Sequence, residues 1–385
     1  MEDTINPNPT SSKQEQQIVA LNDFKLPVVI NNDSDYQNRL ESVLNLYLEN
    51  IRNRKYVDDQ VFEQAQQNVE NIVKAIESYY VADISTARQL IYDVLHPYKN
   101  NGYIISNLED STAFRGFSRQ SDRRNPDSFA RAYNPISFFK ARVGTGTYDK
   151  KDFLHIPFNK RGIVSTQRFS IAGVPCMYFG STSYVCWLEL DKPADNEFNV
   201  SSYLVNGRTK ILNLTGSQYL INGLTAFGDL TLEMQSLIGI FPLIIATSFK
   251  VKENSRSFKS EYIVSQLVMQ CLSDLGVEGV AYTSKRVESN LWHDSTCVNL
   301  AIPMRNNSDN YSEFAKELEL TNSINYAEYK KISTPTVPVN RRTAYCNSFE
   351  QKISYLGSVM YYKQLDFSKF DDFLASQLHE VAMFK

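Results

Sequence analysis

Four widely separated side chains have types that could together bind and cleave a phosphorylated glycoside. Arg168 is followed ten residues later by Tyr178, and Glu189 comes eleven residues after Tyr178. Ser284 lies in a second segment, just past a short apolar run. A guanidinium group grips phosphate oxygens, and a carboxylate stabilises positive charge that develops on a sugar ring. An aromatic ring can stack on a planar group, and a hydroxyl can orient a polar one.

Each of these residues also has an ordinary structural interpretation when it is taken alone. Glu189 would be a solvent-facing helix residue, and Arg168 would be a surface charge. Tyr178 would be a core aromatic residue, and Ser284 would be a turn residue. Their order and joint spacing are what favour a shared functional site.

The spacing of the four residues resembles the RES domain, a family whose name records its Arg, Glu and Ser. The run from Arg168 through a Gly-Val-Pro turn to Tyr178 and Glu189 is similar to the family pattern. Residues 138–142 resemble the opening strand of the domain, and residues 298–303 resemble its closing strand. The resemblance covers residues 137–303, which is under half of the chain.

This resemblance implies NAD⁺ chemistry. RES domains degrade NAD⁺ by cleaving the bond between nicotinamide and ribose, with phosphate or water as the acceptor, and their fold is similar to that of ADP-ribosyltransferase toxins. NAD⁺ would be the substrate, inorganic phosphate a candidate co-substrate, and no further cofactor is implied. Many RES proteins are toxins paired with an antitoxin, so an antitoxin or regulatory partner is expected, and a stress-triggered or antiphage role would be consistent.

The resemblance also implies a role for each matching residue. Glu189 would stabilise positive charge on the ribose, Arg168 would clamp the diphosphate, Tyr178 would stack on nicotinamide or ribose, and Ser284 would orient an amide or hydroxyl. These four are the predicted catalytic residues, and the last three also bind the dinucleotide.

Further residues could contact the dinucleotide. Arg142 could add a second phosphate contact, with a structural ion pair as the alternative. Asn299 and Asn290 could bind ribose, or they could be polar residues at a strand edge or in a turn. Trp292 and His293, near Ser284, could form a lid.

Two other functions remain open. An ADP-ribosyltransferase would begin with the same bond cleavage and pass the product to a macromolecule, and a catalytically silent NAD-binding or interaction protein would use the RES-like segment as a scaffold. Signatures of dinucleotide-binding GxGxxG loops, P-loops, HExxH metalloproteases and GxSxG hydrolases are absent from the sequence. The five cysteines form no CxxC pair, so no metal site is expected.

Composition further limits the class of protein to which this sequence can belong. The 385 residues carry a net charge of −3, are 42% hydrophobic and 22% charged, and therefore suit a globular protein rather than a general polyanion binder. The longest apolar stretch, 237–249, is interrupted by Gly239 and Pro242, and the first residues lack the pattern of a signal peptide. We therefore expect a cytoplasmic protein without membrane or direct nucleic-acid partners.

Apolar periodicity predicts the elements that position these side chains. Helices are expected over 40–51 and 62–80, and a third begins near Asp83 or Ser85 and stops before Pro97. A strand over 177–180 precedes a helix that Ser181 or Ser183 caps. The other expected elements are a buried strand over 243–251, a helix over 260–275, strands over 277–282 and 297–302, and a terminal helix near 367–384.

This pattern predicts an α+β protein in which an all-α region precedes the RES-like domain. The expected divisions are a flexible tail (1–34), a helical domain (35–110), a linker (111–135), the RES-like domain (136–305) and a C-terminal extension (306–385). A homo-oligomer is expected, because chains of this size commonly form symmetric assemblies.

Overall fold

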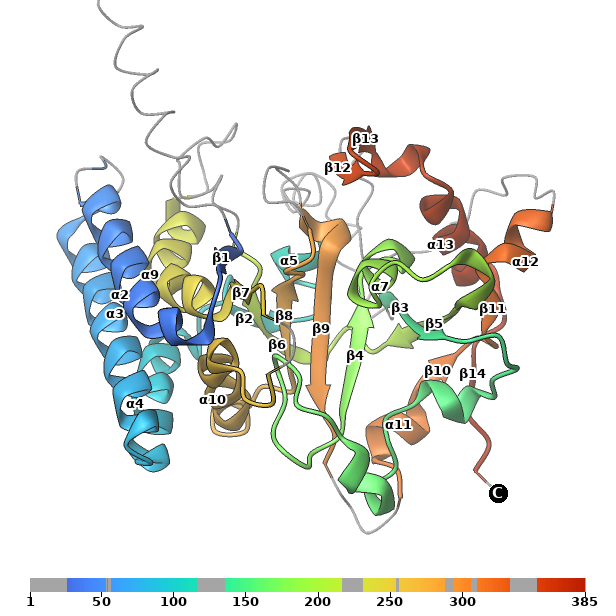
Figure 1. The fold of residues 1–385 in the computed structure, drawn as a ribbon, viewed down its shortest axis with the longest axis horizontal. Coiled ribbons are helices and arrows are strands. Elements are labelled where there is room, and N and C mark those ends of the chain that lie inside the picture. Colours follow the sequence, from blue (N-terminus) through green and yellow to red (C-terminus); the bar gives the residue numbers. More distant parts are fainter. Residues whose placement is uncertain are drawn as a thin grey trace, which may run out of the picture.

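The computed structural model describes residues 26–52, 54, 57–115, 136–216, 231–253, 256–287, 294–305, 310–332 and 352–384. Helices and strands are interleaved in these ranges, which confirms the α+β class (Figure 1). The α-helices are α2 (Tyr36–Ile51), α3 (Asp59–Tyr80), α4 (Ile84–Leu95), α5 (Thr112–Arg115), α7 (Ser183–Glu189), α9 (Thr231–Thr247), α10 (Ile263–Cys271), α11 (Glu313–Glu317), α12 (Tyr326–Lys331) and α13 (Asp366–Ser376). The strands are β1 (Val28–Ile30), β2 (Ile105–Asn107), β3 (Ile136–Val143), β4 (Cys176–Gly180), β5 (Phe198–Val205), β6 (Lys210–Leu214), β7 (Phe249–Val251), β8 (Gly279–Thr283), β9 (Val298–Pro303), β10 (Glu319–Leu320), β11 (Ile324–Asn325), β12 (Lys352–Tyr355), β13 (Ser358–Tyr361) and β14 (Glu380–Val381).

One mixed sheet of ten strands forms the centre of the molecule, in the order β14-β10-β5-β3-β4-β9-β8-β6-β2, with β11 attached to β5. The β4–β9 and β8–β9 pairs are antiparallel, with Tyr178 opposite Ala301 and Tyr282 opposite Asn299. Residues two apart on a strand share a face, and so do directly opposite residues of paired strands. Tyr178, Asn299 and Tyr282 therefore lie on one face of the sheet.

Helices α2, α3 and α4 pack together with α9 and α10 beside the sheet (Figure 1). A single hydrophobic cluster contains residues from all five helices and from β8, and it includes Leu40, Ile72, Ile91, Ile245 and Val280. The predicted helical region and the RES-like region thus share one core. Burying the apolar faces of these helices is the main driving force that holds them in place.

The helix α9 continues through Pro242, and Tyr47 of α2 makes this possible. Proline has no N–H, so it cannot bond to the carbonyl four residues earlier, which belongs to Ile238. The Tyr47 hydroxyl donates to that Ile238 carbonyl at 2.8 Å, and Tyr47 is almost fully buried. A side chain from another helix therefore satisfies the acceptor that the proline leaves open.

The C-terminal extension covers α7 with aromatic side chains. Tyr184 and Trp187 of α7 contact the Phe367 ring of α13, with ring centroids 5.5 and 5.4 Å apart. Tyr355 of the β12–β13 hairpin packs against both α7 residues. This cluster couples the short helix α7 to residues more than a hundred positions later in the chain.

Most expected elements near the predicted site are confirmed. Asp83 caps α4 by accepting from Thr86 N, and the helix ends at Leu95, before Pro97. The expected helix over 260–275 is found as α10, and the expected strands over 177–180, 277–282 and 297–302 are found as β4, β8 and β9. Elements with clear periodicity or clear end signals were predictable.

Three expectations are wrong in part. Residues 243–247 belong to α9 and only 249–251 form a strand, because a short, uniformly apolar run does not distinguish a buried helix from a buried strand. The terminal helix ends at Ser376, where Gln377 turns to an extended conformation, and β14 follows. Within the predicted tail, residues 28–30 form β1, paired with β7.

Residues 116–135 of the predicted linker lie outside the described ranges. No helix in the described part of the chain is long and apolar enough to span a bilayer.

Candidate active site

Glu189 is the last residue of α7, and Gly180 allows that helix to fold back against β4. A Cβ atom at Gly180 would lie 2.6 Å from Val185 Cγ1 and 2.7 Å from Cys186 Sγ. Real Cβ atoms do not come so close to carbon or sulfur, so a larger residue would push α7 away. The close approach of α7 to β4 thus requires glycine at this position.

Thr182 caps α7 at its start. Its Oγ1 accepts from Val185 N at 3.1 Å and donates to the Thr296 carbonyl at 2.6 Å. The expectation that Ser181 or Ser183 is the cap is therefore wrong, because the extended backbone of the residue between them suits an N-cap. Ser183 N instead donates to the buried Asp371 carboxyl of α13 at 2.9 Å.

The Glu189 carboxylate is held between a buried amide and an exposed guanidinium group. Asn299 Nδ2 donates to Glu189 Oε1 at 2.7 Å, and Arg286 Nε lies 3.8 Å from Glu189 Oε2. Asn299 is buried, whereas the Glu189 side chain is 39% exposed. The carboxylate is thus oriented by the protein and still accessible to a ligand. Asn299 was expected either to bind ribose or to be a polar residue at a strand edge or in a turn. It lies on β9, and its side chain contacts the predicted catalytic residue Glu189.

Arg168 is a buried cation, not a surface charge. One terminal nitrogen donates to the Thr283 carbonyl at 2.9 Å, and the other donates to Ser248 Oγ at 3.2 Å. The guanidinium carbon lies 4.8 Å from the ring centroid of Tyr282 and 5.1 Å from that of Phe169. Burial lowers the pKa of Arg168 to about 10, while Tyr282 and Glu189 act in the opposite direction. The group is therefore protonated at neutral pH and is electrostatically coupled to Glu189.

Tyr178 supports the segment that carries Arg168. Its hydroxyl donates to the Phe169 carbonyl at 2.6 Å, and the ring packs against the large core cluster. Burial raises the pKa of Tyr178 well above its usual range, so the hydroxyl stays protonated. The hydroxyl is committed to the backbone beside Arg168, and only the ring could face a ligand.

Ser284 orders the turn that follows β8. Ser284 N donates to the Cys297 carbonyl at 2.9 Å, and Ser284 Oγ accepts from Arg286 N at 3.1 Å. The side chain is 3% exposed. The hydroxyl therefore fixes the two cations that follow it, Lys285 and Arg286, near Glu189 and Arg168.

The other predicted residues lie elsewhere or are not described. Arg142 donates to the Asp152 carbonyl, and its guanidinium carbon lies 5.4 Å from the Tyr148 ring centroid. None of these contacts involves Glu189, Arg168 or Ser284. Asn290, Trp292 and His293 lie outside the described residues.

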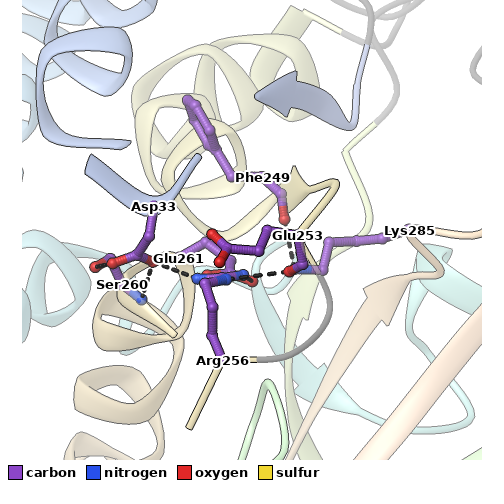
Figure 2. Close-up of polar contacts among 7 residues, drawn as sticks. All are labelled: Asp33, Phe249, Glu253, Arg256, Ser260, Glu261 and Lys285. Atoms are coloured by element: carbon purple, nitrogen blue, oxygen red, sulfur yellow. Dashed lines mark hydrogen bonds and ion pairs between the residues drawn. The ribbon is translucent and has the colours of Figure 1, made fainter. Parts of the chain in front are cut away.

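Several residues of this cluster were not predicted. Lys285 donates to the Phe249 carbonyl (Figure 2), and its Nζ lies 4.6 Å from the ring centroid of Tyr262. Burial lowers the pKa of Lys285 well below its usual range, and the charge of Arg168 lowers it further. Arg286 also pairs with Asp191 at 2.7 Å. The two consecutive basic residues directly after Ser284 are a sequence signal that could have identified Lys285 and Arg286 as site residues. Nothing in the sequence places Ser248 or Tyr262 beside them.

The arrangement combines one accessible carboxylate with three cations, two of them shielded from solvent. Such a site suits a ligand that carries phosphate groups and develops positive charge at one carbon. Among the described residues, no group of three or more His, Cys, Asp or Glu side chains could hold a metal ion.

No family model matches this chain, and no solved structure matches it. A similar protein is one named "Putative toxin YopC" from Bacillus subtilis (strain 168). The two are 28% identical over an alignment of 305 positions, which covers 74% of this chain and 64% of the relative. The chain thus spans less than two thirds of the length of the relative that it matches.

Proposed function

We propose that this chain is a RES-type enzyme that cleaves NAD⁺ at the bond between nicotinamide and ribose, with phosphate or water as the acceptor. The observation that carries the proposal is the oriented, accessible Glu189 carboxylate, bound to Asn299 and electrostatically coupled to the buried Arg168. The four predicted residues also lie near one another. Arg168 donates to the carbonyl of Thr283, the neighbour of Ser284, and Tyr178 donates to the carbonyl of Phe169, the neighbour of Arg168.

The chemistry needs one carboxylate and no acid. When the bond from ribose C1′ to nitrogen breaks, its electron pair goes to the pyridinium nitrogen, so nicotinamide leaves as a neutral molecule. Positive charge moves onto the ribose, where the Glu189 carboxylate stabilises it. An oxygen of phosphate, or of a water molecule that releases a proton, then bonds to C1′. The products are nicotinamide and either ADP-ribose 1″-phosphate or ADP-ribose.

The neighbouring groups bind and orient. Arg168 offers a charged donor set to the diphosphate, and the Tyr178 hydroxyl fixes the backbone from which Arg168 extends. Asn299 holds Glu189 in one orientation, and Ser284 orders the turn that carries Lys285 and Arg286. In this assignment Asn299, Tyr178 and Ser284 are positioning residues.

We also propose that the protein acts as a toxin. The support is its similarity to the relative named as a toxin, together with the harm that NAD⁺ depletion does to a cell. Such an activity requires control, by an antitoxin or by another part of the chain. Expression of the wild type should lower cellular NAD⁺ and stop growth, whereas expression of Glu189→Gln should do neither.

The decisive experiment is product analysis of NAD⁺ incubated with the purified protein, with and without phosphate. Nicotinamide with ADP-ribose 1″-phosphate would identify a phosphorylase, and nicotinamide with ADP-ribose would identify a hydrolase. Label from NAD⁺ that appears on protein or nucleic acid would instead identify an ADP-ribosyltransferase. Intact NAD⁺ after long incubation with folded protein would contradict the proposed cleavage.

A further inference from the structure

Two cations of the site are anchored to the same two segments of the chain. Arg168 donates to Ser248 Oγ at 3.2 Å and to the Thr283 carbonyl at 2.9 Å. Lys285, two residues after Thr283, donates to the carbonyl of Phe249, the neighbour of Ser248 (Figure 2). Both charged groups therefore lie between the start of β7 and the end of β8.

The carboxylates that act on this pair are engaged with other groups. Arg256 binds Glu261 with two hydrogen bonds, of 3.1 and 3.0 Å, as Figure 2 shows. Glu189 is bound by Asn299 at 2.7 Å and lies near Arg286. Each still acts on Lys285 at longer range, against the opposing charges of Arg168 and Lys259.

The buried guanidinium group also has an unused donor. Arg168 is 7% exposed, and its Nε has no hydrogen-bond partner among the described residues. A buried donor without an acceptor is costly, and such a group in a native structure calls for an explanation such as a bound ion. An anion placed against Arg168 would supply both an acceptor and a neutralising charge.

We propose that Arg168 and Lys285 together form a two-cation subsite for a phosphate group, in which Lys285 is a ligand-binding residue. The inference deepens the proposed function and rests on it for the identity of the ligand. The shared chemistry is a phosphate oxyanion, and its source is either the diphosphate of the dinucleotide or inorganic phosphate. Arg168 and the protonated form of Lys285 repel each other in the empty site, and both attract the same anion.

Binding at this subsite takes up a proton. Burial and the charge of Arg168 lower the pKa of Lys285 well below its usual range in the empty site, with Lys259 acting in the same direction. Glu261 and Glu189 act in the opposite direction, and the ring of Tyr262 covers the ammonium group. A phosphate oxyanion beside Lys285 favours the charged form, so the pKa rises on binding.

The test is calorimetric titration of the full chain with ADP-ribose and, separately, with inorganic phosphate. ADP-ribose suits the proton measurement because its diphosphate has no proton to exchange near neutral pH. Titrations at about pH 7 and about pH 9, each in two buffers of different ionisation enthalpy, measure how many protons binding takes up at each pH. Lys285→Met removes the charge, Lys285→Arg retains it, and Lys250→Met on the exposed side of β7 is the matched control.

We expect the wild type to bind ADP-ribose with proton uptake. Lys285→Met should bind at least about tenfold more weakly and take up no proton, whereas Lys285→Arg should recover affinity without proton uptake. Lys250→Met should match the wild type. Binding of inorganic phosphate alone, with the same dependence on Lys285, would identify free phosphate as the source. Wild-type affinity in a folded Lys285→Met variant, or no binding of either ligand to the wild type, would overturn the subsite.

The phosphate subsite and NAD⁺ cleavage can be tested separately. Lys285-dependent binding of ADP-ribose by a protein that leaves NAD⁺ intact would support the subsite and refute the proposed enzyme. Cleavage of NAD⁺ by Lys285→Met with the wild-type KM would support the enzyme and refute the subsite.

Discussion

Asn299 Nδ2 lies 2.7 Å from Glu189 Oε1 and joins the central strand β9 to the end of α7. The amide is buried and the carboxylate is accessible, so a strand of the sheet holds a group that solvent can reach. The same strand position is opposite Tyr282, whose ring lies against Arg168. The predicted charge-stabilising residue and the predicted phosphate clamp are therefore tied to the same pair of strands.

Glu189→Gln should lower the rate of NAD⁺ cleavage about 10²–10³-fold, because it removes one charge that stabilises the transition state. Glutamine can still accept from Asn299, so the fold and the affinity for ADP-ribose should be retained. The measurement is kcat with saturating NAD⁺, and the control is Glu317→Gln on the exposed end of α11. Wild-type kcat in Glu189→Gln would remove this residue from the mechanism.

Arg168→Lys should weaken NAD⁺ binding about tenfold or more. An ammonium group cannot reproduce the planar fork that reaches both Thr283 and Ser248 while it presents a further donor. Calorimetric titration of NAD⁺ gives the affinity, with the exposed Arg39→Lys as control. If both variants bind like the wild type, Arg168 does not contact the ligand.

Gly180→Ala should displace α7 and reduce turnover more strongly than it reduces ligand affinity. The added Cβ would collide with Val185 and Cys186, and overpacking of this kind typically costs about 1–3 kcal/mol of stability. Thermal unfolding and kcat should both change, whereas Gly146→Ala, which meets no atom within 4 Å, should change neither. An unaffected Gly180→Ala enzyme would show that the placement of α7 is not required.

Asp371→Asn should make the protein more stable than the wild type at alkaline pH. Burial raises the pKa of Asp371 to about 8, above the usual value of about 3.9. The folded state thus keeps a proton that the unfolded state releases, so wild-type stability falls as pH rises from about 4 through about 8, with a slope of up to about 1.4 kcal/mol per pH unit. Asparagine can still accept from Ser183 N but does not titrate.

Urea unfolding of wild type and Asp371→Asn at about pH 5, 7 and 9 measures this difference. The gap in unfolding free energy should widen in favour of the variant as the pH rises. The surface variant Asp366→Asn on the same helix should follow the wild type. A gap that does not change with pH would mean that Asp371 does not titrate in this range.

Tyr47→Phe should cost about 1–3 kcal/mol of stability, because it leaves the buried Ile238 carbonyl without its donor next to Pro242. The loss should be larger than that of Tyr92→Phe on the neighbouring helix α4. Combining Tyr47→Phe with Pro242→Ala should recover most of the loss, since alanine restores the helical N–H. Additive losses in the double variant would contradict this pairing.

How much of this site was predictable depends on the range of the interactions involved. The sequence was sufficient to predict Arg168, Tyr178, Glu189 and Ser284 as site residues, because each lies next to a local signal such as a glycine turn or a strand end. Ser248 and Asp371 carry no such signal, since their roles come from partners 80 and 188 residues away. The α9 error has a local origin, because the uniformly apolar run suits a buried helix and a buried strand equally well. The donor to the Ile238 carbonyl comes from Tyr47, 191 residues away.

The shared core of the N-terminal helices has a consequence for how the chain folds during synthesis. Tyr36 bonds to the Ala246 carbonyl across a separation of 210 residues, and Asn68 bonds to the Gly239 carbonyl across 171. Loop closure over such distances is slow, and the first three helices cannot complete the burial of their apolar faces until α9 and α10 have left the ribosome. The nascent chain therefore exposes part of these apolar faces until α10 is made, and the Glu189 site cannot assemble on a truncated product that lacks β9. Premature termination or proteolysis before α10 would yield an aggregation-prone fragment without the site, and a chaperone has its longest opportunity to bind during this interval.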